Sequence, residues 1–273
     1  MFGSIYKLST KLSNRCVTKT LSRSITQQRA SMEEYFKGKR FIVTGASAGM
    51  GKVIAGRLIA LDAHVFAVGR DVERLPDADN LKLTKASVDV GEWETAYNEV
   101  LAMGPVHGLV NNAGVAHIES FLETTKKGWD DTLNINARGM VRISQAVAKN
   151  MIDAKIRGSI VNISSTISEK AIPDHVAYCA SKGAVNQITR TMAIELGTYG
   201  IRTNNVNPTV VLTKMGKKAW SDPKKSEPIL NRIPLGRFAE PSDIADAVIF
   251  LLSDYSQMVN GLNLYVDGGF MSG

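Results

Sequence analysis

The chain has 273 residues, 44% of them hydrophobic and 22% charged, which suits one globular α/β domain with a substantial core and a short extension. The formal net charge of +7 comes mainly from the first 31 residues, which contain six cations and no acids and leave 27 cations against 26 acids in the rest. This even balance excludes a nucleic-acid surface built on excess positive charge, and the lack of any run of about 20 apolar residues argues against a membrane span.

Residues 1–31 have the composition of a targeting segment. They are rich in Ser and Thr, and Ile5, Leu8, Leu12 and Leu21 lie among the cations in a loosely helical rhythm. This pattern is typical of a mitochondrial presequence and lacks the long apolar run of a secretory signal. We expect a location in the mitochondrial matrix if the segment is a presequence, and a cytoplasmic one if it is a disordered tail or if the product starts at residue 32.

Residues 32–273 are expected to form a single domain in which apolar runs of strand length alternate with helical stretches. Such alternation predicts right-handed crossovers and a parallel sheet covered by helices on both faces. We therefore predict a doubly wound, Rossmann-type α/β fold with seven strands. The expected strands are 40–44, 64–68, 81–87, 108–110, 159–163, 202–206 and 261–266.

A glycine-rich turn follows the first predicted strand and precedes an amphipathic stretch at 52–61. Residues 44–51 read Thr-Gly-Ala-Ser-Ala-Gly-Met-Gly, a spacing that differs from the standard dinucleotide fingerprint. Glycines there allow a tight turn, a close approach of backbone N–H groups to a pyrophosphate, and close contact between helix and strand. We predict a nucleotide site that includes Gly45, Ser47, Gly49, Met50 and Gly51.

The end of the second predicted strand bears on the choice of cofactor. An acidic residue there binds the ribose diol of NAD and repels a 2′-phosphate, whereas an arginine favours the phosphate of NADP. Here the strand ends in Gly69-Arg70, so we predict NADPH/NADP+ as the cofactor. Asp71 and the small residue Ala48 in the glycine turn weigh against this choice, and a solvated Arg70 is the alternative.

Tyr178 and Lys182 stand four residues apart in a stretch, 177–196, that we expect to be helical. That spacing places the phenol and the ammonium on one helix face, about one turn apart. A cation at about 4 Å in an effective dielectric of about 20 favours the phenolate by about 4 kcal/mol before desolvation, so we expect Lys182 to lower the pKa of Tyr178 from about 10. Tyr178 would exchange a proton with a carbonyl or alcohol oxygen, and Ser165, after the strand 159–163, would polarise that oxygen. The alternative is that Tyr178 merely packs and Lys182 is solvated.

Four motifs resemble the signatures of the short-chain dehydrogenase/reductase family: the glycine turn, Asn111-Asn112-Ala113-Gly114, Ser165, and Tyr178-Cys179-Ala180-Ser181-Lys182. The resemblance runs from about residue 32 to the C-terminus. Within the family, residues 207–213, 220–223 and 231–236 are similar, almost letter for letter, to the reductases of L-xylulose and α-dicarbonyls and to a related tetrameric carbonyl reductase.

The resemblance implies roles for further residues. Asn136 would complete a catalytic tetrad with Ser165, Tyr178 and Lys182 by anchoring a water that relays protons to the lysine. Otherwise Asn136 is a helix-interior amide, and Asp89 is the cap of a helix that starts near residue 93. The implied cofactor contacts, besides the glycine turn and Arg70, are Asp89, Val90, Asn112, Ala113, Gly114, Tyr178, Lys182, Val211 and Thr213.

The same resemblance implies a substrate site. Residues 209–234, rich in Lys, Pro and Ser, interrupt the alternation of strands and helices, and we interpret them as a mobile substrate lid. Without the resemblance, His175 and Trp220 would be expected to be structural. The implied substrate contacts are Ser165, Thr166, His175, Tyr178 and Trp220.

Together these features predict an NADPH-dependent reductase that converts a ketone or α-dicarbonyl to an alcohol, with L-xylulose to xylitol as the implied reaction. The alternatives are a β-ketoacyl or hydroxysteroid reductase, or a nucleotide-binding regulator without turnover. The resemblance also implies a homotetramer built on two long helices, 127–152 and 177–196, and on the last strand. The four histidines are scattered without ligand spacing, so no metal site is predicted.

Overall fold

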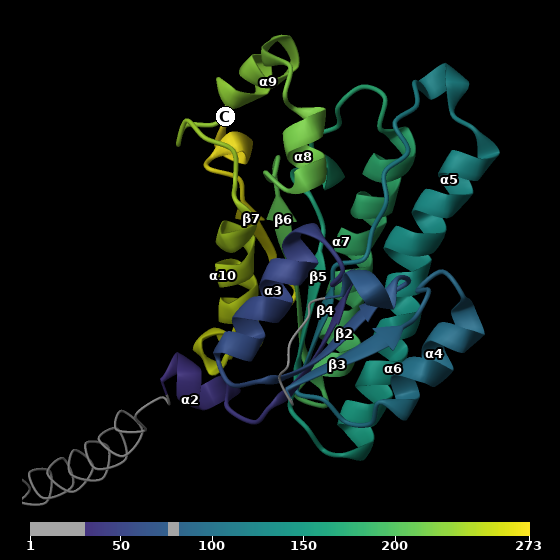
Figure 1. Cartoon of the computed structure of the whole chain (residues 1–273), viewed down its shortest axis with the longest axis vertical. Coiled ribbons are helices and arrows are strands. Elements are labelled where there is room, and N and C mark those ends of the chain that lie inside the picture. Colours follow the sequence, from purple (N-terminus) through teal and green to yellow (C-terminus); the bar gives the residue numbers. More distant parts are fainter. Residues whose placement is uncertain (1–30, 76–81) are drawn as a thin grey trace, which may run out of the picture. The chain divides into compact units, whose positions relative to one another are not determined.

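Seven parallel strands form one sheet in the order β3-β2-β1-β4-β5-β6-β7 (Figure 1). The computed structural model describes residues 31–75 and 82–273, and the predicted presequence lies outside these residues. The doubly wound fold predicted from the sequence is confirmed. The strands are β1 (Arg40–Thr44), β2 (His64–Gly69), β3 (Leu83–Ser87), β4 (Gly108–Asn111), β5 (Ser159–Ile163), β6 (Arg202–Pro208) and β7 (Asn263–Val266).

The strand predictions err mainly at the ends. β6 runs two residues further than expected, because its asparagines are hydrogen-bonded inside the sheet region rather than exposed at a turn. Asn204, Asn205 and Asn207 are each 0% exposed. The Asn205 amide donates to Asn263 in β7 at 2.8 Å, and the Asn207 amide donates to the backbone of Ser165 at 3.1 Å. Most polar side chains of this buried strand are thus hydrogen-bonded, but among the described residues the Thr203 hydroxyl and the Asn207 side-chain oxygen have no partner.

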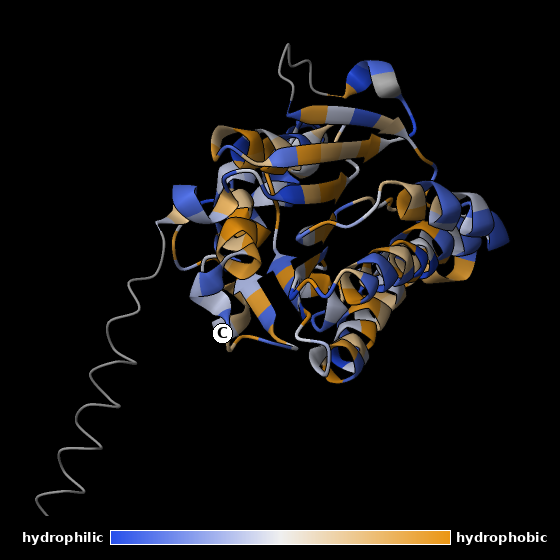
Figure 2. Cartoon of the chain, turned by 90° about the horizontal axis from the view of Figure 1, so that it is seen from below, coloured by the Kyte–Doolittle hydropathy of each residue, from blue (hydrophilic) through white to orange (hydrophobic). Residues whose placement is uncertain are grey.

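Each face of the sheet is covered by helices whose apolar sides meet alternate strand residues (Figures 1 and 2). Phe41 and Val43 of β1 pack on the face of α3 (Gly49–Ala60) and α10 (Pro241–Leu252). Ile42, between them, packs on the opposite face, in the same cluster as residues of α4 (Trp93–Ala102) and α6 (Met140–Asp153). α7 (Val176–Gly197) adds Met192 and Leu196 to this second face. The alternation follows from the period of two in a strand.

The long helix expected at 127–152 is interrupted. α5 (Lys126–Leu133) passes into a π-helical segment, η3 (Asn134–Gly139), before α6 begins. A π-turn inserts extra backbone into a helix and is often found at functional sites. Here the segment contains Asn136, one of the predicted catalytic residues.

The expected substrate lid, 209–234, contains regular structure. α8 (Lys214–Ala219) and α9 (Pro223–Leu230) both lie within it. Each begins at a side-chain cap, because Thr213 accepts a hydrogen bond from the N–H of Gly216 and Asp222 accepts one from the N–H of Lys224, both at 3.0 Å. The prediction of a mobile substrate lid did not include either helix.

The remaining elements are short. They are α2 (Met32–Phe36) and the 3₁₀ turns η1 (Val72–Arg74), η2 (Phe121–Glu123), η4 (Thr166–Ser168), η5 (Asp254–Ser256) and η6 (Phe270–Ser272). Within the described ranges, no helix is both long and apolar enough to cross a membrane.

Candidate active site at the carboxyl ends of the strands

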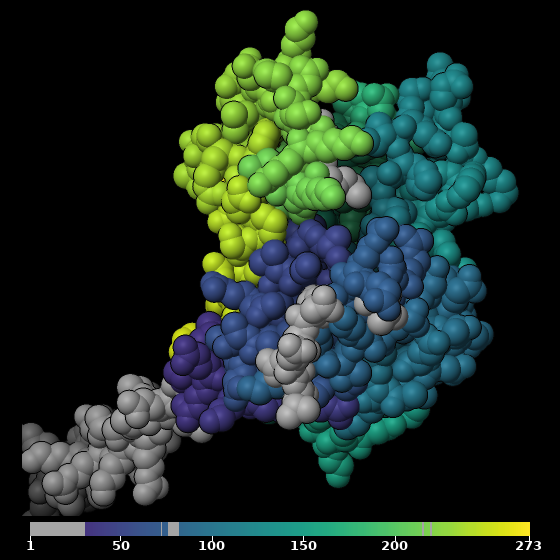
Figure 3. All heavy atoms as spheres, viewed as in Figure 1, coloured from purple at the N-terminus to yellow at the C-terminus, as the bar shows by residue number. Residues whose placement is uncertain are grey.

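The predicted site residues lie where strands end. All seven strands point the same way, and the strand order reverses between β1 and β4, where a doubly wound sheet leaves a crevice for ligands. In the space-filling view the surface is hollowed between the lid helix α8 and the segment that follows β4 (Figure 3). The fold therefore brings to one edge the residues that follow β1 (45–51), β2 (70), β3 (89–90), β4 (112–114), β5 (165) and β6 (211–213).

The glycine turn packs too tightly for side chains. A Cβ added to Gly51 would lie 2.4 Å from the Gly45 carbonyl oxygen and 2.5 Å from the Asn112 amide nitrogen. That amide donates to the carbonyls of Thr44 at 3.0 Å and Gly45 at 3.2 Å, so it ties the end of β4 to the turn. Gly45 has φ of +65°, the left-handed region that glycine adopts at no cost. Asn112 thus acts inside the turn, and a Cβ on Gly45 would come within 2.9 Å of Ala113.

The N-terminus of α3 fits the pyrophosphate of a dinucleotide. Its N-cap residue, Ala48, has no side-chain hydrogen bond to offer, and the first turn has no acid. The first N–H groups of this helix of 12 residues are thus left for an anion. A Cβ on Gly49 would lie 3.2 Å from the Thr213 methyl group, so the start of the lid covers the turn.

The end of β2 lies beside the glycine turn. A Cβ on Gly69 would lie 3.7 Å from Ser47, and the N–H of Ala46 donates to the carbonyl of Val68 at 3.1 Å. Arg70 follows at once and is exposed. The carboxylate of Asp71 pairs with Arg74 at 2.9 Å. Ser47 and Arg70 thus both lie at the end of β2, where the adenosine ribose is predicted.

For Asp89 and Val90, after β3, the structure gives less direct support for the predicted cofactor contacts. The Asp89 carboxylate accepts the N–H of Gly91 at 2.9 Å, while the N-cap of α4 is Glu92, so Asp89 is not the helix cap considered above. Val90 is 8% exposed and belongs to the core. Their contact with an adenine ring stays a prediction.

Ser165, Tyr178 and Lys182 are brought together between β5 and α7. The Ser165 side chain lies near enough to Tyr178 to lower the pKa of its phenol, and the Ser165 hydroxyl donates to the Pro208 carbonyl at 3.4 Å. The Lys182 ammonium nitrogen lies 5.5 Å from the centre of the Tyr178 ring and donates to the Ile163 carbonyl, at the end of β5, at 2.7 Å. A helix spacing of four and a strand end therefore place three polar groups around one point, as the sequence predicted.

The pKa of Tyr178 is shifted in the opposite direction to that expected. Burial raises the pKa of Tyr178 to about 12, and the nearby Ser165 side chain offsets only part of this effect. Burial also lowers the pKa of Lys182 to about 8. The prediction that the lysine lowers the tyrosine pKa was wrong, because desolvation of the phenol is the largest effect and Lys182 is not among the groups that shift it.

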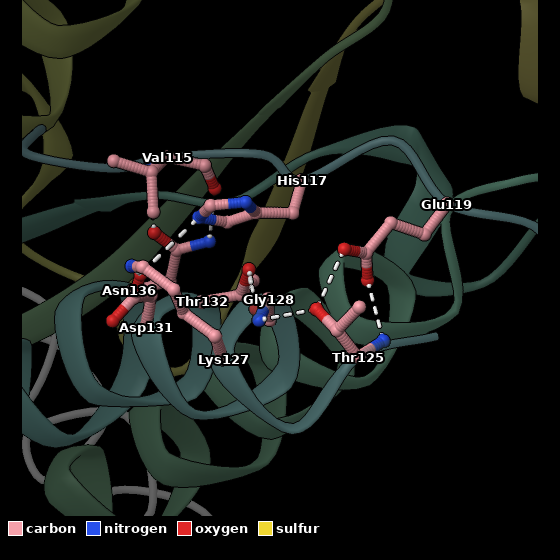
Figure 4. Close-up of polar contacts among 9 residues, drawn as sticks. All are labelled: Val115, His117, Glu119, Thr125, Lys127, Gly128, Asp131, Thr132 and Asn136. Atoms are coloured by element: carbon pink, nitrogen blue, oxygen red, sulfur yellow. Dashed lines mark hydrogen bonds and ion pairs between the residues drawn. The ribbon is translucent and has the colours of Figure 1, made fainter. Parts of the chain in front are cut away.

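Asn136 joins this group through the π-helical segment. Its side-chain oxygen accepts the N–H of Val115 at 2.8 Å, and its amide donates to the Val115 carbonyl at 2.9 Å (Figure 4). The same amide donates to Ser181 at 3.0 Å. A Cβ on Gly114 would lie 3.2 Å from the Asn136 oxygen and 3.8 Å from the Lys182 nitrogen. Asn136 is thus adjacent to the lysine, with its amide committed to protein groups, and its role in anchoring a water stays a prediction.

The predicted substrate contacts differ in their surroundings and in their exposure. The His175 ring lies 6.4 Å from that of Tyr178. Thr166 is 6% exposed, which leaves little surface for a substrate. Trp220 packs on Phe238 with ring centres 6.1 Å apart. Val211 pairs with Ala239 in an isolated bridge at the start of the lid.

Sequence analysis did not predict two residues that support the site. Ser181 accepts from Asn136 and donates to the Tyr178 carbonyl at 2.8 Å, and it stands inside the Tyr-Cys-Ala-Ser-Lys motif, which was the signal. Asn207 holds the Ser165 backbone, and it begins the stretch 207–213 that carries the resemblance, which was the signal. A cavity of about 750 Å³ lies elsewhere, lined by Arg237, Asp243 and Tyr265 among others, and none of the predicted site residues is in its lining.

Known proteins resemble this chain over most of its length. A family model described as enoyl-(acyl carrier protein) reductase matches residues 45–271. L-Xylulose reductase of Homo sapiens is 45% identical over 244 residues, which cover 88% of this chain and 99% of the human protein. Carbonyl reductase (NADPH) 2 of Sus scrofa is 40% identical over 248 residues, covering 88% of this chain and all of the pig protein. A gluconate 5-dehydrogenase from Burkholderia cenocepacia J2315, solved in complex with NADP and tartrate, superposes with a TM-score of 0.82 at 30% identity, covering 89% of this chain and 100% of that one.

Proposed function

Because this chain belongs to the short-chain dehydrogenase/reductase family of oxidoreductases, we propose that it reduces a ketone or α-dicarbonyl to an alcohol with NADPH, with L-xylulose and small dicarbonyls as substrates. The observation that carries the proposal is the convergence of Ser165, Tyr178 and Lys182 at the strand ends beside the glycine turn. The 45% identity to L-xylulose reductase of Homo sapiens supports the choice of substrate.

The geometry suits proton transfer to a carbonyl oxygen. Bound NADPH supplies the hydride that the carbonyl carbon accepts. Tyr178 gives its proton to the oxygen as an alkoxide develops, and its pKa of about 12 keeps that proton in place at neutral pH until the alkoxide takes it. Ser165, beside Tyr178, would turn its hydroxyl from the Pro208 carbonyl to donate to the same oxygen and stabilise its charge.

Lys182 keeps a positive charge near this centre at neutral pH, because its pKa is about 8. Its ammonium would hold the hydroxyls of the nicotinamide ribose. The bond to the Ile163 carbonyl orients the amine from the strand end, and this preorganisation supports the role.

NADPH is favoured by the residues at the end of β2. Ser47 and Arg70 border the predicted ribose position, and Gly69 replaces the acid that would repel a 2′-phosphate. The pairing of Asp71 with Arg74 supports the choice, because that carboxylate is engaged elsewhere.

His175 supports a substrate that carries hydroxyl groups. Its Nδ1 lies 2.7 Å from the Pro173 carbonyl, to which only a protonated nitrogen can donate. In the neutral ring, Nε2 is then an acceptor, and the ring centre lies 6.4 Å from that of Tyr178. A hydroxyl next to the carbonyl of a sugar ketone would donate to it.

We also propose a homotetramer built on α5–α6, α7 and β7, and a mitochondrial location. Ile194, on α7, is 77% exposed, and β7 is an edge strand, which supports contact with another copy. Light scattering on the purified protein tests the assembly, and a monomer at micromolar concentration would refute it. The N-terminus of protein isolated from cells tests the location, since a start at Met1 would count against cleavage.

A spectroscopic assay tests the activity. The full chain is mixed with NADPH and L-xylulose, diacetyl or an acetoacetyl thioester, and the absorbance of NADPH is followed. We expect oxidation with the first two carbonyls. Oxidation with the thioester alone would favour the β-ketoacyl alternative, and no oxidation with any carbonyl would favour a regulator.

A further inference from the structure

The segment between β4 and η2 carries an ordered strap, residues 115–119. Val115, His117 and Glu119 are partly buried, while Ala116 and Ile118 between them are exposed. This alternation is that of an extended chain with one face against the protein. The strap therefore has an inner face of three residues, which no sequence motif predicted.

The inner face runs antiparallel along the helix that follows it. Val115 bonds to Asn136, His117 lies 3.6 Å from the Asp131 carboxylate, and Glu119 bonds to Thr125 (Figure 4). The residue numbers of the helix partners thus decrease as those of the strap residues increase. One end of the strap holds a predicted catalytic residue and the other reaches the start of α5.

Glu119 is anchored through both carboxylate oxygens. Oε2 accepts the N–H of Thr125 at 3.0 Å, and Oε1 accepts the Thr125 hydroxyl at 2.7 Å. These two bonds lower the pKa of Glu119, so the group stays ionised at neutral pH. The approach is close, because a Cβ on Gly128 would lie 2.5 Å from Oε2. A negative group at a helix N-terminus is also favoured by the helix dipole.

The backbone of Glu119 holds the segment before α7. Its N–H donates to the Asp174 carbonyl at 2.9 Å, and Glu119 pairs with His175 in a parallel bridge. Asp174 has φ of +63°, a conformation that costs a residue other than glycine about 1 kcal/mol or more and needs outside support. Glu119 supplies one such support, next to the histidine that lies against Tyr178.

We propose that Glu119 is a positioning residue that fixes His175 beside Tyr178 and thereby sets the affinity for carbonyl substrates bearing hydroxyl groups. The inference rests on the proposed function. Its carboxylate fixes the strap on α5, and its amide fixes Asp174 and His175. Without the carboxylate, His175 samples other positions. The apparent affinity for these substrates then falls in proportion to the fraction of time that His175 is correctly placed. Diacetyl has no hydroxyl that could donate a hydrogen bond to His175, so its binding is insensitive to this change.

The kinetic test compares Glu119→Ala with Glu123→Ala in the full chain. Glu123 is exposed on η2 in the same connection, so its loss removes equal charge without the anchor. For Glu119→Ala we expect the KM for L-xylulose to rise about 10-fold with kcat nearly unchanged, no change in the KM for diacetyl, and partial rescue in Glu119→Gln. In a His175→Ala background, Glu119→Ala should add nothing further. Equal changes for both substrates, or additive effects with His175→Ala, would overturn the proposal.

Amide hydrogen exchange tests the positioning independently of turnover. The N–H of Cys179 donates to the His175 carbonyl at 2.8 Å, so a peptide covering 173–179 reports on this junction. Its exchange should be faster in Glu119→Ala, or in Glu119→Gln should the first variant not fold, than in Glu123→Ala. Equal exchange would overturn the placement of His175 by Glu119. Failure of the unmodified chain to reduce any carbonyl would instead count against the proposed function, while the exchange result still decides the positioning.

Discussion

The Lys182 ammonium nitrogen lies 5.5 Å from the centre of the Tyr178 ring and is bound to the Ile163 carbonyl at 2.7 Å. Burial acts on the two groups in opposite directions, raising the pKa of Tyr178 to about 12 and lowering that of Lys182 to about 8. At neutral pH the pair therefore consists of a protonated phenol and a charged amine, the forms needed to reduce a carbonyl. The amine is the first of the two to lose its proton as the pH rises.

The pH dependence of carbonyl reduction follows from Lys182. Burial disfavours the charged amine, so its proton leaves at a lower pH than in water, and the rate should be level below about pH 8 and fall above it. The measurement is kcat/KM for diacetyl between pH 6 and about 10. A guanidinium keeps its charge over this range, so Lys182→Arg should be slower but lack the decline. A decline that began only near the ordinary lysine pKa would contradict the account.

Arg70 should determine the preference for NADPH. Charge-assisted hydrogen bonds contribute about 1.5–3 kcal/mol, so Arg70→Asp should weaken NADPH binding by about 10- to 100-fold and favour NADH. Arg157→Asp is the control, since Arg157 is exposed and precedes β5, at the other edge of the sheet. Kinetic constants with both cofactors give the answer. An unchanged preference in Arg70→Asp would show that another residue reads the phosphate.

Gly51 and Gly56, both in α3, should respond oppositely to alanine. A Cβ on Gly51 would lie 2.4 Å from the Gly45 carbonyl oxygen, so Gly51→Ala should destabilise the fold by about 1–3 kcal/mol. Gly56 has no atom within 4 Å of a Cβ, so Gly56→Ala should stabilise it by about 0.5–1 kcal/mol. Chemical denaturation measures both. Similar effects at the two positions would argue against the tight packing of the turn.

The sequence was most informative where local pattern and chemistry coincide. Apolar runs gave β1, β2 and β5, and the spacing of Tyr178 and Lys182 placed both side chains at one point of the site. The prediction of the family is also confirmed. Three strands, β2, β4 and β6, end later than predicted, and two, β3 and β7, start later than predicted. Side-chain amides and turns decide where strand pairing stops. α10 was not foreseen, although Pro241 at its start and an apolar rhythm were present.

Other features depend on contacts between distant segments. No sequence motif marks the π-helical turn around Asn136, whose side chain bonds to Val115, 21 residues away. The anchor between Glu119 and the start of α5 likewise has no motif. The shift of the Tyr178 pKa depends on burial, which spacing does not reveal. Such properties arise from tertiary packing rather than from local pattern.

Tyr178→Phe tests the central claim most directly. The change removes the hydroxyl that donates the proton and keeps the ring, so NADPH binding, measured by quenching of protein fluorescence, should be unchanged. Single-turnover reduction of diacetyl should fall by about 10²- to 10⁴-fold, the usual contribution of a general acid. Reduction at the rate of the unmodified chain, with NADPH bound, would contradict the role of Tyr178 as proton donor.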